Sequence, residues 1–297
     1  MHYLVPLVGL IGLIGFVGIQ GKACGYAVLA LPCYAVVLWL HFNVKAWVPF
    51  INPATYDAEF MAVDRQMHGI VDACIAIRGW LATWVPGIND LYMNGFMLLF
   101  YCSFIVHSMK TPDQFRTLFL SALLLQGLGG LCYLLFPAIG PFLYETGANP
   151  VLTQAQAHML AVREAAVAGG REWLAANGAR EFVSPLGAMP SLHAGGGFLF
   201  LWFAWKHCRV LLPLYVPLFA FILIGAIANR FHYIVDLPAG IALAGLSIWL
   251  AHRLHAGQPW PSGWRWATLP PFGAVMRADG GLRQTPKTAL AKAPATR

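Results

Sequence analysis

Charged residues are scarce in this chain of 297 residues: Asp, Glu, Lys and Arg make up only 10% of it, while 59% is hydrophobic. A typical soluble domain has about 25% charged residues. With a mean hydropathy of +0.63, the chain has more apolar surface than a single soluble core can bury, so we expect an integral membrane protein. The apolar runs are continuous rather than alternating, which excludes a transmembrane barrel of strands and leaves membrane-spanning helices.

Cysteines are also few, and the chain lacks repeats. The six cysteines are scattered and form no C-x-x-C pair, so we interpret them as packing residues and expect neither a metal site nor a cofactor. The sequence has no internal repeat and no second soluble domain. We therefore expect one membrane-embedded domain over residues 1–255 and a basic, disordered tail over 256–297.

Long apolar runs predict the spans, because a helix needs about 20 residues to cross the hydrocarbon. The seven candidate spans are 3–20, 25–42, 92–109, 116–136, 194–206, 210–229 and 237–254. The first lacks the basic start and small-residue cleavage site of a signal peptide. The sequence thus predicts an all-α polytopic bundle of about six or seven transmembrane helices, with interfacial and extracytoplasmic helices.

Charges of opposite sign fall on opposite sides of these spans. The basic loops and the basic tail share one side, which the positive-inside rule makes cytoplasmic. Ten acidic residues share the other side: Asp57, Glu59, Asp64, Asp72, Asp90, Glu145, Glu164, Glu172, Glu181 and Asp236. The formal charge of +7 therefore indicates topology and no nucleic-acid partner. We expect a bacterial inner membrane location, with the C-terminus cytoplasmic.

Two long stretches on the outer side lie between spans. Residues 43–91 carry apolar residues at helical spacing with charges between them, which fits a helix lying in the membrane interface or, equally, a packing helix. Residues 138–188 predict a helix that opens at Asn149–Pro150 and breaks at Gly169–Gly170. We leave open whether residues 145–185 form a lid.

Two short polar stretches carry the candidate chemistry. "AMPSLHAGGG" (188–197) contains His193, and "NRFHYIVDLPAG" contains His232 and Asp236. The predicted topology puts both histidines at one depth on the outer face. If "HYIVDLPAG" starts a helix, the i,i+4 spacing puts His232 and Asp236 on one side of it. The carboxylate would then orient His232 as a nucleophile or base, with His193 as the general acid.

The same stretches offer groups that suit an oxyanion such as phosphate. Ser191 and the backbone N–H groups of the helix that begins after Pro190 can donate hydrogen bonds to it. Arg230 is the adjacent cation, and Tyr233, Tyr144 and Arg180 are further candidates. Taken singly, an interfacial histidine is often structural, and Arg230 alone suits a helix-end anchor.

These motifs resemble those of the type 2 phosphatidic acid phosphatase superfamily, and the nearest likeness is to the branch of fungal inositolphosphorylceramide synthase. "PSLH", "HYIVD" and "LFPAIGPF" (135–142) carry the resemblance, which covers about residues 90–255. The resemblance implies that His232 forms a phosphohistidine, that Asp236 orients it and that His193 protonates the leaving group. The superfamily's first motif, K-x6-R-P, has no match on the outer face, and the arginine expected before the third motif is Ala226 here.

Four functions remain open. The first is a lipid phosphotransferase that moves a phospho-headgroup from a membrane lipid to a lipid or alcohol acceptor on the extracytoplasmic face. The second is a phosphatase of phosphatidate or a prenyl pyrophosphate. The scarcity of cations favours the first, because a diester carries less charge than a monoester. The third is a transporter, although a transporter would place its charges nearer the bilayer midplane. The fourth is a catalytically silent membrane scaffold.

Overall fold

The computed structural model describes residues 25–145, 150–181, 184 and 186–256, and these residues form helices joined by short connections, with no strand among them. This confirms the predicted all-helical membrane fold. The predicted span at 3–20 and residues 257–297 of the predicted tail lie outside the described residues.

Five of the described helices are long and apolar enough to cross a membrane. Their apolar segments are Ala30–Ile51 in α2 (Gly25–Ile51), Ile88–Lys110 (α5), Pro112–Leu135 (α6), Arg209–Ala228, which contains α9 (Leu212–Ala228), and Asp236–Leu254 in α10 (Asp236–Ala256). Each matches a predicted span. The predicted span at 194–206 is α8 (Leu192–His207), whose 16 residues rise only about 24 Å and do not cross the hydrocarbon alone.

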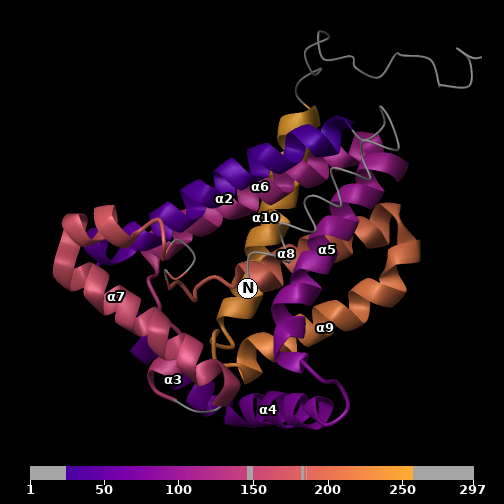
Figure 1. Ribbon diagram of the computed structural model, residues 1–297. Coiled ribbons are helices and arrows are strands. Elements are labelled where there is room, and N and C mark those ends of the chain that lie inside the picture. Colours follow the sequence, from indigo (N-terminus) through magenta and orange to yellow (C-terminus); the bar gives the residue numbers. More distant parts are fainter. Residues whose placement is uncertain (1–24, 146–149, 182–183, 185, 257–297) are drawn as a thin grey trace, which may run out of the picture. The chain divides into compact units, whose positions relative to one another are not determined.

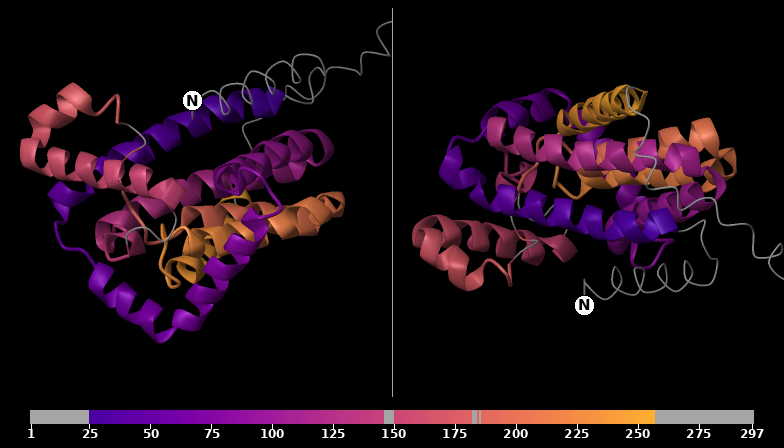
Figure 2. Two further views of the ribbon diagram at one scale, coloured as in Figure 1. Left: turned by 60° about the horizontal axis from the view of Figure 1, so that its bottom comes forward. Right: turned by 90° about the horizontal axis from the view of Figure 1, so that it is seen from above.

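The short helix α8 is surrounded by α5, α6, α9 and α10 (Figure 1), while α2 and α6 lie side by side (Figure 2). Glycines allow this crowding. A Cβ on Gly195 would stand 2.6 Å from the carbonyl oxygen of Gly240 on α10, which is far inside van der Waals contact. Small residues thus allow the close approach of α8 and α10, as they do in many pairs of membrane helices.

We predict that Gly195→Ala destabilises the fold by about 1–3 kcal/mol, because the new methyl group meets rigid backbone. The matched control is Gly127→Ala, where a Cβ meets nothing within 4 Å and alanine favours the helix. Thermal unfolding in detergent measures both variants. Equal unfolding temperatures for the two would contradict the packing described for α8 and α10.

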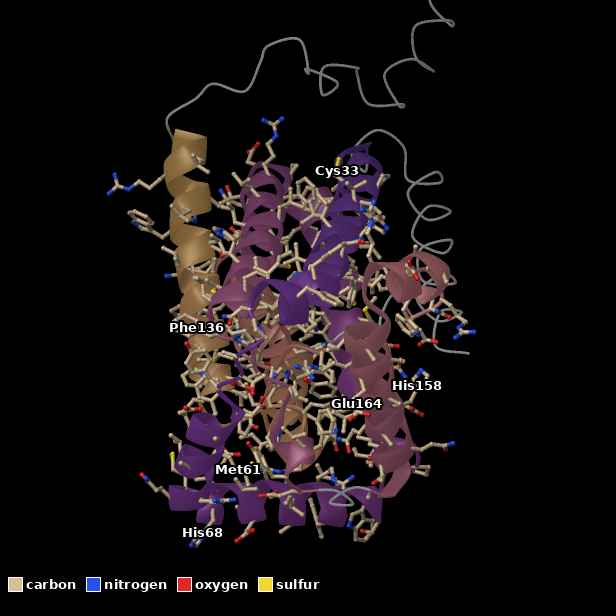
Figure 3. All side chains as sticks on the ribbon, turned by 90° about the vertical axis from the view of Figure 1, so that its left-hand side faces the viewer. Cys33, Met61, His68, Phe136, His158 and Glu164 are labelled. Carbon is tan, nitrogen blue, oxygen red and sulfur yellow. The ribbon has the colours of Figure 1, made fainter. Side chains whose placement is uncertain are left out.

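The stretch 43–91 contains parts of four helices, the last being the start of α5 at Ile88. Its beginning completes α2, its middle forms α3 (Asp57–Gln66), and α4 (His68–Ala82) follows. In Figure 3 the segment at His68 runs crosswise to the long helices. Helix α4 packs against α9 and leaves Trp80 62% exposed. The packing reading is confirmed, and a position in the membrane interface stays a prediction.

The stretch 138–188 contains α7 (Pro150–Asn177), which is interrupted where Gly170 adopts φ 57° and ψ −144°. The predicted break at Gly169–Gly170 is therefore confirmed, since glycine reaches this conformation without strain. Gln156 is buried and donates a hydrogen bond from Nε2 to the carbonyl oxygen of Asn229 at 2.8 Å. This bond ties α7 to the turn that precedes His232.

One end of the bundle gathers the polar motifs. Backbone hydrogen bonds join the start of α8 to α10 (Ser191 N–H to Asp236 O, 3.0 Å) and the segment after α6 to the segment before α8 (Ala188 N–H to Ala138 O, 2.8 Å). Lys110 lies at the other end of α5 and α6, about 35 Å away along α6. The basic segment "KTPDQFR" (110–116) is thus remote from the histidines.

Candidate active site

Ser191 fixes the start of α8 and links it to the start of α10. Its hydroxyl accepts the N–H of Ala194 at 3.3 Å, which caps the helix, and its own N–H donates to the carbonyl oxygen of Asp236. Ser191 and Asp236 are both fully buried. The serine side chain is therefore committed to the cap, and contact between Ser191 and a phosphate stays a prediction.

Helix α10 begins at Asp236, so the prediction that a helix starts at His232 is wrong. A helix starting at His232 would put Pro238 in its second turn, where proline removes a hydrogen bond and clashes. Starting at Asp236 places Pro238 in the first turn, where it is tolerated. His232 therefore lies in the turn before α10, and the carboxylate of Asp236 reaches back to accept the N–H of Tyr233 at 2.8 Å.

His232 and Asp236 still meet. The Nδ1 atom of His232 lies 2.9 Å from the carbonyl oxygen of Ala188 and 3.3 Å from Oδ2 of Asp236. A carbonyl only accepts, and an ionised carboxylate only accepts, so the proton must sit on Nδ1. The Nε2 atom then carries a lone pair. This tautomer, with its proton on Nδ1, is the one that a nucleophile or a base needs.

His193 lies across from His232, from the first turn of α8. The centroids of the two rings are 6.4 Å apart with an angle of 62° between their planes. The ring of His193 also contacts Tyr92 and Phe96 of α5, with centroid distances of 5.1 and 4.8 Å. His193 is half-buried and His232 is buried. The structure thus brings together the three residues predicted to be catalytic, and their roles stay predictions.

Arg230 is not a free cation. Its side chain is 1% exposed, and it forms ion pairs with Asp64 (3.1 Å) and Glu145 (2.7 Å). Its backbone has φ 56°, a left-handed conformation. Burial raises the pKa of Asp64, and the N–H of Ile234 and the charge of Arg230 oppose that rise. A phosphate bound to Arg230 would compete with two carboxylates.

Asp57, which belongs to none of the sequence motifs, anchors the segment "LFPAIGPF". Its buried carboxylate accepts the N–H groups of Ile139 at 2.9 Å and Gly140 at 2.9 Å. It also accepts the hydroxyl of Tyr233 at 2.8 Å. Burial, together with this bond, raises the pKa of Tyr233, so the phenol stays a neutral donor. The sequence could have pointed to Asp57 in one way, because an acidic residue is rare in so apolar a chain and is therefore expected to have a specific partner.

We predict that Asp57→Asn destabilises the protein by about 1–3 kcal/mol, because an amide oxygen cannot replace a carboxylate that accepts from three donors at once. Activity should fall with it, since Tyr233 adjoins His232. Thermal unfolding and turnover are to be compared with Asp72→Asn, whose side chain is 76% exposed. If Asp57→Asn unfolds at the same temperature as Asp72→Asn, the anchoring role is wrong.

The remaining candidates lie outside this cluster. Tyr144 is 46% exposed. Arg180 is exposed and bonds to Glu181 at 3.1 Å and to Asn177 at 3.3 Å. Within the described part of the chain, neither is recorded in contact with His193 or His232. No group of three or more His, Cys, Asp or Glu residues in that part is placed to hold a metal ion.

The fold and the site together define an all-helical integral membrane protein with two histidines and a buried aspartate at one end of its bundle. The model of the PAP2 superfamily matches residues 58–250, well over half of the chain, so the chain belongs to this superfamily. It is an enzyme of the phosphatase or phosphotransferase type that acts on lipid phosphates. No curated protein and no solved structure matches the chain significantly.

Proposed function

We propose that this enzyme is a lipid phosphotransferase that moves a phospho-headgroup from a donor lipid to a lipid or alcohol acceptor. The observation that carries the mechanism is the pair of acceptors on Nδ1 of His232, the Ala188 carbonyl and the Asp236 carboxylate. They hold the ring with Nε2 as its free nucleophile, beside His193. The motifs that resemble the inositolphosphorylceramide synthase branch support the same function.

The reaction has two balanced halves. In the first, Nε2 of His232 attacks the phosphorus of the donor, the bond between phosphorus and the diacylglycerol oxygen breaks, and His193 gives its proton to that oxygen. In the second, His193 takes the proton of the acceptor hydroxyl as the acceptor oxygen attacks phosphorus. The bond from Nε2 to phosphorus then breaks, which restores His232 and His193 to their starting states.

The charge at the site favours transfer of a diester over hydrolysis of a monoester. A phosphate monoester carries up to two negative charges and needs several cations around it, whereas a diester carries one. The nearby cation Arg230 is already matched by Asp64 and Glu145. Arg230 therefore has no uncompensated charge to offer to the second negative charge of a monoester, which suits a phosphodiester donor. We place the site on the extracytoplasmic face, because the basic loops lie at the other end of the spans.

The test is an assay on the purified protein in detergent with a headgroup-labelled phospholipid extract. We expect the label to appear on a new lipid, and mass spectrometry identifies that lipid and so the acceptor. Free phosphate, or a free phospho-headgroup without a new lipid, would instead identify the enzyme as a hydrolase of phosphatidate or a prenyl pyrophosphate.

A further inference from the structure

A cavity of about 420 Å³ lies next to the candidate active site but outside it. Its walls come from the second half of α2, from α7 and from the segments 137–139 and 186–187. His193, His232 and Asp236 do not line it. Gly187 does, and the following residue, Ala188, accepts the hydrogen bond of His232. The cavity and the site thus share one strip of backbone, and the cavity has the size of a ligand pocket.

The cavity carries unbalanced positive charge. Three cations line it, Lys45, Arg163 and Arg171, and the structure records no ion pair between any of them and a described carboxylate. The one acidic lining residue, Glu181, is already paired with Arg180 at 3.1 Å and with His158 at 3.0 Å. Partial burial would raise the pKa of Glu181, but its hydrogen bonds hold the pKa below its usual value. Such a cavity attracts an anion.

Lys45 is the most informative of the three cations. It lies within the span Ala30–Ile51, about one and a half turns before its end. Its Nζ lies 5.0 Å from the ring centroid of Tyr133 and 5.9 Å from that of Phe42. A lysine inside a span is costly and marks a functional position by default. Lys45 is also one of the residues that line the cavity, as are Phe42 and Tyr133 beside it.

The cavity also continues to the apolar surface of α2. Trp39 and Trp47 line it and are nevertheless 55% and 43% exposed. Tryptophan is common where a protein meets the boundary between lipid and water. A ligand bound here therefore meets both cations and exposed aromatic side chains of a membrane-spanning helix, which is the chemistry of an anionic phospholipid.

We propose that this cavity binds an anionic glycerophospholipid, with its phosphate among Lys45, Arg163 and Arg171 and its acyl chains along α2. The next step rests on the proposed function: this lipid is the donor, and the cavity holds it beside the histidines before transfer. The donor is then anionic rather than zwitterionic, and three residues that the motifs do not contain bind it.

The test measures binding without turnover, on full-length His232→Gln protein in detergent. Native mass spectrometry follows dioleoylphosphatidylglycerol and, in parallel, dioleoylphosphatidylcholine. The triple variant Lys45→Gln, Arg163→Gln, Arg171→Gln should bind the anionic lipid about tenfold more weakly, as expected for lost charge-assisted contacts. The matched control removes three cations at the other end of the bundle, by Lys110→Gln, Arg209→Gln and Arg253→Gln, and should stay within about twofold of the parent.

Three results would overturn the proposal. The first is equal binding of both lipids, and the second is an equal loss of affinity for the anionic lipid in the two triple variants. The third is displacement of the lipid by inorganic phosphate at millimolar concentration, which would indicate a site for free anions. If the triple variant does not fold, the exposed Arg171→Gln alone should still weaken binding measurably. In active protein the same changes should raise KM for the donor and spare kcat. Failure of every lipid to react would instead refute the proposed function.

Discussion

Replacing His232 with glutamine is expected to lower headgroup transfer by at least about 10³-fold, as is usual when the nucleophile of a covalent mechanism is lost. Glutamine can still donate a hydrogen bond to the Ala188 carbonyl, so the turn before α10 should keep its conformation. It has no nitrogen lone pair to attack phosphorus. Initial rates with the labelled donor, measured beside an unfolding curve, separate loss of chemistry from loss of fold.

The matched control is His68→Gln, because this histidine lies on α4 with its side chain 78% exposed. It should keep the activity and the unfolding temperature of the parent protein. If His232→Gln retains activity within about tenfold of His68→Gln, the nucleophile lies elsewhere. Such a loss would be smaller than the loss of a general acid or base alone, which costs about 10²–10⁴-fold.

Replacing Arg230 with methionine is expected to destabilise the protein by about 3–5 kcal/mol, the cost of leaving a buried ion pair without one partner. Asp64 is 1% exposed and Glu145 is 38% exposed, so the substitution leaves two carboxylates close together, one of them fully buried. Chemical or thermal unfolding in detergent measures the loss.

A rescue variant separates this structural role from phosphate binding. Adding Asp64→Asn and Glu145→Gln to Arg230→Met removes the uncompensated charges, and we expect most of the lost stability to return. If transfer returns with it, Arg230 only shapes the site. If stability returns and transfer stays more than about tenfold low, Arg230 also contacts the phosphate. No loss of stability in the single variant would contradict the ion pairs seen here.

Much of this fold was predictable because its signals are local. A run of apolar residues predicts a span wherever it occurs, and five of the predicted spans lie on helices long and apolar enough to cross a membrane. Gly170 breaks α7 because the conformation there favours glycine. The predicted start of α10 was wrong by four residues, because the i,i+4 spacing of His232 and Asp236 also fits the first turn of a helix. A turn closed by the Asp236 carboxylate brings the same two residues together.

The partners of the site were not predictable, because they come from distant segments. Asp57 and Asp64 lie on α3, yet they bond to Tyr233, Ile234 and Arg230 near the other end of the chain. A single sequence shows that these acids are rare and on the outer side, but not which cation or N–H each one meets. Lys45 was missed for the same reason, because the cavity that it lines is formed by segments distant in the sequence, α2, α7 and residues 186–187.

The most direct test of the account is to find the covalent intermediate on His232. The protein is incubated with the donor lipid without acceptor, quenched at alkaline pH to preserve phosphoramidate bonds, and digested for mass spectrometry. We predict that the peptide containing His232 gains the mass of the phospho-headgroup, and that His232→Gln abolishes the adduct. An adduct on His193, or no adduct during active turnover, would contradict nucleophilic attack by His232, and a bare phosphoryl group would identify a phosphatase.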